Sequence, residues 1–566
     1  MIRTPGDRPE RWRSARPCYP RAPSPPPPQR SPTVSDRTVY LETFGCQMNE
    51  LDSELVRGQL EALGYRFTED PGQASILLYN TCSVREQAEN KAFSRIGLAG
   101  VRKREGEELL VGVLGCMAER DGTDMLRRHP QIDLLCGPGE LDKLPLLIDN
   151  ASRTANGEAT GLERVALAGN TSRRSAALSA AADDLESLDL GRLFDPDKAA
   201  GRSRSAYVRI TRGCNKFCTY CVVPHTRGAE IHRPPDGIVE ECRRLAASGV
   251  QEITLLGQTV NHYRYTHGTA LTIDGVERPQ VGPGLAAFRN EVLDDPDTTT
   301  FAGLLARIHD EVPELPRLRF LTSYPRDFGD DVLDVMAARP RICPYLHVPV
   351  QSGSNRILKL MNRGYTVEEY LDFIDRVRDR LPDACIAGDI IVGFPTETDE
   401  DFEATKSLMR RVPFKNNFIF KYSPRPGTVA IDRFPDDVPD EVKRARNNEL
   451  LALQAEIGAD VHAGWVGREV DVLVERVTER APSPAVSGAD GRVRLGTGLA
   501  PAGSASPSTA TSGPRAVQVS GRTPGDLITV FEVDDLEAAR ESVGSIRRVG
   551  IESSGPLLLR GRLLGP

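Results

Sequence analysis

Three closely spaced cysteines give this sequence its clearest chemical signal. Residues 211–228 read TRGCNKFCTYCVVPHTRG and place Cys214, Cys218 and Cys221 in a CxxxCxxC spacing. Thiolates at this spacing are typical ligands for zinc or for an iron-sulfur cluster. A disulfide framework is not expected, because the chain has an odd number of cysteines, 11, and no apolar secretion signal near its start. We call these three residues the CxxxCxxC triad.

Zinc and an iron-sulfur cluster are the alternatives for this triad. Structural zinc needs four ligands, so His225 or Cys242 would have to be the fourth, and the paired CxxC motifs usual in zinc loops are missing. A [4Fe-4S] cluster bound by three thiolates leaves one iron open for chemistry. Gly213 permits an unusual backbone angle before the first cysteine, and we expect Phe217 and Tyr220 to shield a cluster.

A second set of three cysteines follows three predicted strands near the start of the chain. The segments TVYLETFGC, ASILLYNTC and ELLVGVLGC lead to Cys46, Cys82 and Cys116, with helical patterns between them. This alternation predicts a parallel α/β sheet, whose strands end along one edge. One such cysteine would be an ordinary core residue. Three in succession, each in a polar turn, predict a second cluster site, which we call the strand-end triad.

Length and composition narrow the class of protein. A chain of 566 residues should hold about three domains. No run of 18 apolar residues is present, so we expect a soluble, cytoplasmic protein. The formal net charge of -8 gives no support to a nucleic-acid partner, which must be argued from sites. The other cysteines are expected to be structural or free: Cys18, Cys136, Cys242, Cys343 and Cys385.

Composition also divides the chain into segments. Residues 1–36 are rich in Arg and Pro and are predicted to be disordered; this basic tail either contacts RNA or is an extension without function. Two further segments are read as insertions, a polar one at 264–298 and a low-complexity one at 481–514. The predicted units are an N-terminal open parallel α/β sheet domain (37–152), a linker (153–203), a partial (β/α)6 barrel (204–435), a connecting helix (436–460) and a small β-barrel (461–566).

The predicted partial barrel places further residues at its working face. Six strand patterns alternate with helices, and the carboxyl ends of such strands carry the sites of β/α barrels. The CxxxCxxC triad follows the first of these strands. Gln351 and Ser352 in HVPVQSGS, and Asp389 in GDIIVGFPTET, lie at later strand ends. We predict that they line a cofactor or substrate cavity; the alternative is that they are turn residues.

The motif of the CxxxCxxC triad resembles the signature of radical S-adenosylmethionine enzymes, in the form found in the methylthiotransferase family. TFGCQMN, NTCSVRE, GCMAER, LLGQTVN and FKYSPRPGT look like further motifs of the MiaB-type branch of that family. The likeness covers most of residues 37–435, and residues 461–563 look like the family's TRAM domain. Motifs of this length in this order are specific.

The resemblance implies two [4Fe-4S] clusters and S-adenosylmethionine as cofactors. The CxxxCxxC triad would bind the cluster that cleaves S-adenosylmethionine to a radical, and the strand-end triad would bind the auxiliary cluster that supplies sulfur. A second S-adenosylmethionine would give the methyl group. The implied substrate is N6-(dimethylallyl)adenosine at position 37, next to the anticodon of tRNAs that read codons beginning with U. An external electron donor and a sulfur source are implied partners, with no membrane, and we expect a monomer.

Other branches and one other class are alternatives. Related branches act on threonylcarbamoylated adenosine in tRNA or on an aspartate of a ribosomal protein; CQMN, rather than CPKN, favours the dimethylallyl branch. Thr259 stands where the family usually has Asn, and His225 where it often has Tyr, which bears on substrate detail. A non-catalytic iron-sulfur or zinc scaffold that binds RNA through its C-terminal barrel is the alternative class. Two complete triads argue against it.

Overall fold

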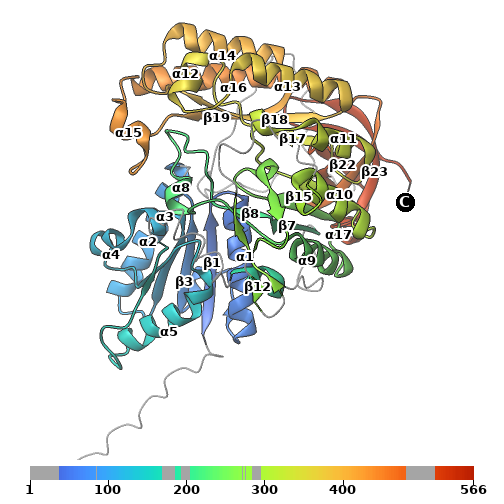
Figure 1. Ribbon diagram of the computed structural model, residues 1–566. Coiled ribbons are helices and arrows are strands. Elements are labelled where there is room, and N and C mark those ends of the chain that lie inside the picture. The colour runs from blue at the N-terminus through green and yellow to red at the C-terminus, as the bar shows by residue number, and fades with distance from the viewer. Residues whose placement is uncertain are drawn as a thin grey trace, which may run out of the picture.

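The computed structural model describes residues 37–83, 86–168, 185–192, 204–270, 272–273, 276–282, 295–479 and 517–565. The tail predicted at 1–36 and the low-complexity insertion at 481–514 lie outside these residues. Figure 1 shows an N-terminal sheet domain, a central α/β domain and a C-terminal small barrel. This arrangement confirms the predicted fold class. None of the described helices is both long enough and apolar enough to cross a membrane.

The N-terminal domain is a parallel sheet with helices on both faces. Its strand order is β2-β1-β3-β4-β5-β6, and β3 and β4 are buried along their whole length, as expected for strands covered on both faces. Helices α1 and α5 pack on one face, and α2, α3 and α4 on the other. The elements are β1 (Thr38–Phe44), α1 (Gln47–Ala62), β2 (Arg66–Phe67), β3 (Ile76–Thr81), α2 (Glu86–Arg104), β4 (Leu110–Gly115), α3 (Cys116–Asp121), α4 (Thr123–Arg128), β5 (Leu134–Cys136), α5 (Leu144–Ala155) and β6 (Val165–Ala166).

Part of the segment predicted as a linker is integral to the fold. Strand β6 extends the sheet by pairing in parallel with β5. Helix α7 (Leu185–Gly191) buries Leu185 in the core of the N-terminal domain. The same helix gives Asp189 and Glu186 to buried ion pairs with arginines of the central domain. These residues therefore fasten two domains together.

The central domain contains the six predicted strands as a partial barrel. Strands β7, β10 and β16 pair in parallel, as do β17, β18 and β19, and a parallel bridge from Leu318 to Ile342 joins the two groups. The large central core lies between these strands and the helices around them. The strands are β7 (Ser205–Arg209), β10 (Glu252–Leu256), β16 (Arg317–Phe320), β17 (Tyr345–His347), β18 (Cys385–Val392) and β19 (Phe414–Lys421). The helices are α8 (Val223–Thr226), α9 (Pro235–Ala247), α10 (Phe301–Glu311), α11 (Asp330–Ala338), α12 (Asn355–Leu360), α13 (Val367–Arg380), α14 (Asp399–Arg411), α15 (Val429–Arg433) and α16 (Asp440–Ala463).

Several short strands pair close to the loop that carries the CxxxCxxC triad. Part of the predicted polar insertion folds back, so that β14 pairs with β9, which in turn pairs with β8 just before the CxxxCxxC triad. Two further pairs, β11 with β15 and β12 with β13, are antiparallel. The bounds are β8 (Thr211–Arg212), β9 (Ile231–His232), β11 (Arg264–Thr266), β12 (Thr272–Ile273), β13 (Val276–Glu277), β14 (Gln280–Val281) and β15 (Thr298–Thr300).

The C-terminal domain is a closed barrel of order β20-β21-β22-β24-β23. Its β21–β22 turn, residues 523–527, fills the amino end of the central barrel: a Cβ added to Gly525 would lie 2.5 Å from the Cys385 sulfur. In the same turn Asp526 has a left-handed φ of 62° and accepts a hydrogen bond from Lys415. The elements are β20 (Glu469–Glu479), β21 (Val517–Arg522), β22 (Ile528–Val533), α17 (Leu536–Ser542), β23 (Ile546–Ser554) and β24 (Leu559–Leu563).

Candidate functional site

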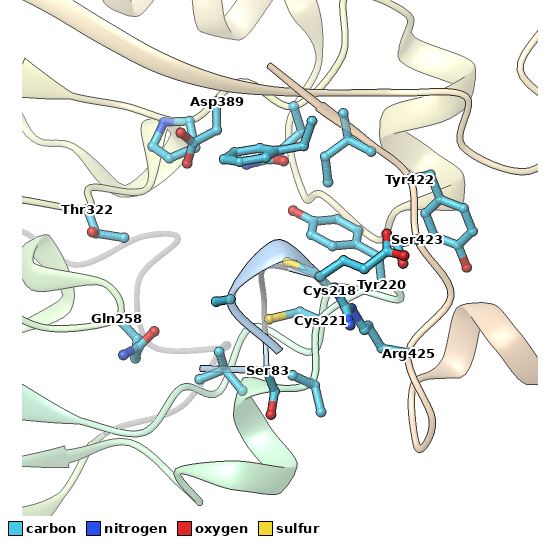
Figure 2. A pocket seen from close by; sticks show the side chains of 18 of the residues that line it. Ser83, Cys218, Tyr220, Cys221, Gln258, Thr322, Asp389, Tyr422, Ser423 and Arg425 are labelled. Atoms are coloured by element: carbon cyan, nitrogen blue, oxygen red, sulfur yellow. The ribbon is translucent and has the colours of Figure 1, made fainter. Parts of the chain in front are cut away.

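A cavity of about 780 Å³ lies between the N-terminal domain and the carboxyl ends of the central strands. The N-terminal domain contributes the end of β1 and residues of α2, and the central domain contributes the cysteine loop and the ends of β18 and β19. Figure 2 shows Asp389 and Thr322 on one side of the cavity and Tyr422, Ser423 and Arg425 on the other. The cavity is therefore placed where parallel α/β folds bind their ligands.

All three residues of the CxxxCxxC triad line this cavity. The loop depends on Gly213, which has a left-handed φ of 66° and whose added Cβ would meet the Ala229 carbonyl oxygen at 2.1 Å. Tyr220 lines the cavity as expected. Phe217 is 53% exposed and is not among the residues that line the cavity in the described chain, so its shielding role stays a prediction.

Burial favours the protonated form of two thiols of the CxxxCxxC triad, Cys214 and Cys221. Burial raises the pKa of Cys214 to about 12, and burial also raises the pKa of Cys221. Arg363 donates a hydrogen bond to the Cys218 sulfur at 3.3 Å. Metal ions bind the deprotonated form and displace these protons, so the site suits a metal cluster that supplies its own positive charge.

The wall beside the CxxxCxxC triad carries a buried polar network. Lys216 forms an ion pair with Asp327 and lies 4.2 Å from the centre of the Tyr324 ring. His262 Nε2 lies 2.6 Å from Asp327 Oδ2. Burial lowers the pKa of Lys216, although Asp327 opposes the shift. With Arg363, this wall offers two positively charged groups to an anionic part of a ligand.

The structure also brings the strand-end triad together. Strands β1, β3 and β4 pair in register, so that Phe44, Thr81 and Gly115 lie side by side and the cysteines follow them. The hydrogen bond with Cys82 lowers the pKa of Cys46 against the effect of burial. Burial raises the pKa of Cys116. Cys46 thus forms a hydrogen bond with Cys82 and acts electrostatically on Cys116, although the three residues are far apart in sequence.

A pair of buried asparagines holds the strand-end triad in place. The Asn49 amide donates to Asn80 Oδ1 at 3.0 Å, and the Asn80 amide donates to the Asn49 carbonyl at 2.8 Å. Asn49 Oδ1 accepts a hydrogen bond from the Cys46 sulfur at 3.4 Å. These bonds fasten α1 to β3 beside the cysteines. Asn49 lies in the motif TFGCQMN and Asn80 in NTCSVRE, but no pattern in the sequence indicates that they support the cysteines.

Residues 222–227 connect the two triads, and we call them the bridging segment. Helix α8 begins two residues after Cys221 and packs against α3, whose first residue is Cys116. Within the described residues, no three His, Cys, Asp or Glu side chains surround a single metal-ion position. A [4Fe-4S] cluster binds each thiolate at a different iron, so its ligands need not converge on one point. The proposed fourth zinc ligands lie elsewhere: His225 is exposed on α8, and Cys242 is in the core on α9.

Of the remaining predicted site residues, some line the cavity and one does not. Gln351, with a left-handed φ of 74°, and Asp389 both line the cavity, and the Gln351 amide donates to the Asp389 carbonyl at 2.8 Å. Ser352 is buried outside the cavity lining of the described chain, where its hydroxyl accepts from the Ser354 amide at 3.2 Å. Thr259 lines the cavity, with its hydroxyl 3.9 Å from the Cys214 sulfur. The departure from the family pattern at Thr259 therefore lies next to the CxxxCxxC triad.

Comparison with known proteins identifies two conserved domains. Residues 208–409 match the model of the radical SAM superfamily, and residues 38–137 match "Uncharacterized protein family UPF0004". Fold and site thus define a radical SAM enzyme. A solved structure, the radical S-adenosylmethionine methyltransferase TsrM from Kitasatospora setae with cobalamin and a [4Fe-4S] cluster, aligns with a TM-score of 0.46 at 17% identity over 70% of this chain and 77% of that chain.

Full-length relatives narrow this class. The tRNA-2-methylthio-N(6)-dimethylallyladenosine synthase of Rhodopirellula baltica is 40% identical over 93% of this chain and 95% of its own length. The protein of the same name from Phocaeicola vulgatus is 39% identical over 80% of this chain and 88% of its own length. The chain belongs to the family of tRNA-2-methylthio-N(6)-dimethylallyladenosine synthases, and the resemblance found in the sequence is confirmed.

Proposed function

We propose that the protein converts N6-(dimethylallyl)adenosine to its 2-methylthio derivative at position 37 of tRNAs that read codons beginning with U. The observation that carries this function is a cavity lined by the CxxxCxxC triad and by Gly45 and Ser83, the chain neighbours of Cys46 and Cys82, in a chain similar over nearly its full length to enzymes named for this product. Cytoplasmic location, monomeric state, an external electron donor and a sulfur source belong to the same proposal.

The six cysteines are proposed as ligands of two [4Fe-4S] clusters. When bound, the clusters and S-adenosylmethionine supply radical chemistry that breaks the unreactive C–H bond at carbon 2 of the adenine ring and supplies the sulfur. The CxxxCxxC triad lines the cavity, whereas two members of the strand-end triad, Cys46 and Cys82, directly adjoin the lining residues Gly45 and Ser83 in the chain. The two sites can therefore serve one bound base.

The chain's own residues orient the cofactor and exclude water. We propose that Gln351 and Asp389 contact S-adenosylmethionine or the base, because both face the cavity from strand ends. Lys216 and Arg363 offer positive charge beside the CxxxCxxC triad. Apolar and aromatic side chains on the β18 and β19 side limit access of water to the reacting atoms: Ile391, Ile419, Phe420 and Tyr422. A base must leave its stack to enter such a cavity.

The substrate is tested by mass spectrometry of nucleosides from tRNA of a strain lacking this gene. We expect loss of the 2-methylthio group with retention of the dimethylallyl group, and restoration by the intact gene. Unchanged 2-methylthio content would overturn the function. The cluster assignment is tested separately, because anaerobically reconstituted protein should bind about eight irons as two [4Fe-4S] clusters. Stoichiometric zinc without iron would overturn that assignment.

A further inference from the structure

We infer that Arg227 is a positioning residue of the strand-end triad, whose guanidinium, held by Asp52, stabilises the cluster bound there and raises its reduction potential. The inference rests on the proposed function, because it requires a cluster at that triad. Arg227 comes from the bridging segment of the central domain, and Asp52 from α1 of the N-terminal domain. The interaction therefore crosses between domains.

Arg227 and Asp52 form a buried ion pair. Arg227 Nη2 lies 2.7 Å from Asp52 Oδ2, and the two side chains are 6% and 0% exposed. A buried charge is costly unless it is paired, so each side chain requires the other. Asp52 Oδ1 also lies 3.9 Å from Arg209 Nη1. The carboxylate thus fixes the guanidinium from the side of α1.

The segment that carries this guanidinium packs beside the strand-end triad. Arg227 follows α8 directly, and α8 packs against α3, which begins at Cys116. Cys46 caps α1, the helix that carries Asp52. Burial alone would lower the pKa of Arg227, but attraction to Asp52, Cys116 and Cys46 outweighs it and raises that pKa. The arginine therefore interacts with two of the three thiols.

A fixed positive charge beside a cluster has a definite electrostatic effect. Reduction adds an electron, so a nearby guanidinium in a buried environment favours the reduced form. Local charge and hydrogen bonds to sulfur are among the main factors that set cluster potentials. The guanidinium also offsets the repulsion among three thiolates, which favours retention of iron. Removing it should lower the potential and weaken iron binding.

The experiment uses full-length protein in which Cys214, Cys218 and Cys221 are replaced by Ala, so that one cluster remains. Its midpoint potential is measured by a redox titration followed by electron paramagnetic resonance, with iron content measured in parallel. In this background, Arg227→Met should shift the reduction equilibrium at least tenfold toward the oxidised form, which is about 59 mV for one electron. Arg227→Lys keeps the charge and should restore most of the potential.

Arg192→Met is the matched control. Arg192 is also buried, 7% exposed, and pairs with Glu54 of the same helix α1 and with Glu241. We expect the midpoint potential of the Arg192→Met variant to equal that of the background protein. Asp52→Asn keeps the guanidinium but removes a negative charge that also acts on Cys116, so it should not lower the potential as Arg227→Met does. Loss of iron from Arg227→Met, with a native circular dichroism spectrum and iron retained in Arg192→Met, also supports the inference.

Two results would overturn the inference alone. One is an unchanged potential and iron content in Arg227→Met. The other is an equal drop in Arg192→Met, which would assign the effect to any buried ion pair between the domains. If Arg227→Met does not fold, Arg227→Gln takes its place in the same titration, and a background potential and iron content in that variant would also overturn the inference. A background protein that binds no cluster would overturn the cluster assignment of the proposed function, and this inference with it.

Discussion

The Glu89 carboxylate accepts a hydrogen bond from the Arg425 guanidinium at 2.8 Å, joining α2 of the N-terminal domain to the segment after β19. Arg120 donates to the same carboxylate oxygen at 2.7 Å. Glu89 thus binds two largely buried arginines, one of which lines the cavity. The contact holds the two domains together beside the site.

Glu89→Gln should weaken this connection. Removing one partner of a buried ion pair leaves the other charges uncompensated and costs about 3 kcal/mol. The midpoint of urea unfolding should fall accordingly, and product formation with it. Glu107→Gln is the control, since Glu107 pairs with Arg102 at the surface and should contribute under about 1 kcal/mol. Equal destabilisation by both changes would contradict the prediction.

Replacement of a cysteine in each triad should separate two activities. Cys218→Ala should abolish cleavage of S-adenosylmethionine, whereas Cys82→Ala should retain part of the cleavage and lose all sulfur insertion. The measurements are 5'-deoxyadenosine and 2-methylthio product by liquid chromatography and mass spectrometry. Cys242→Ala removes a buried thiol of the core and should retain both activities. Methylthiolated product from Cys82→Ala would show that the strand-end triad is not the sulfur site.

Gly213→Ala should disrupt the loop of the CxxxCxxC triad. The new Cβ would overlap the Ala229 carbonyl oxygen, and the left-handed backbone would be strained as well. We expect iron content to fall by about half, because only one of two clusters is lost. Gly64→Ala has a φ of 92° but open space, so it should cost about 1 kcal/mol and keep its iron. Full iron content in Gly213→Ala would refute the argument.

The contact between the small barrel and the central barrel should depend on acid pH through Asp526. Burial opposes its ionisation, but Lys415, Arg319 and Arg522 outweigh burial and lower its pKa from 3.8 to about 2. A carboxylate with a lowered pKa stabilises the fold above pH 3.8 and loses that contribution as pH falls toward 2. The shift corresponds to about 2 kcal/mol.

Asp526→Asn tests this contribution, because asparagine tolerates the left-handed backbone. The variant should be less stable than the parent protein at pH 7, and the difference should shrink as pH falls below 4. The measurement is chemical unfolding followed by circular dichroism at both pH values. A difference that stays constant with pH would assign the loss to something other than the charge of Asp526.

The sequence predicted the repeating parts of this fold because hydrophobic periodicity is a local property. The six central strands and the five strands of the small barrel lie where their apolar patterns indicated. Cysteines at three successive strand ends could be grouped from the rule that parallel strands end at one edge. In contrast, β6 and α7 lie in a segment of weak periodicity and are stabilised by contacts with distant residues.

The supporting residues of the site were not predictable in the same way. Arg227 and Asp52 are 175 positions apart, and nothing in either local pattern indicates the pairing. Ser352 and Gln351 are neighbours in one motif, yet only Gln351 lines the cavity, because its left-handed backbone turns the chain there. Such differences depend on backbone geometry and long-range packing. The six cysteines were found because their spacing and strand-end positions repeat.

The turn at residues 523–527 closes the end of the central barrel that lies opposite the site. Gly525 packs against Cys385 at the start of β18, and Tyr345 at the start of β17 belongs to the same apolar core. In the described part of the chain, the amino end of the central barrel is therefore plugged. Ligands of the cavity must therefore approach from the carboxyl ends of the central strands, on the side where the N-terminal domain lies.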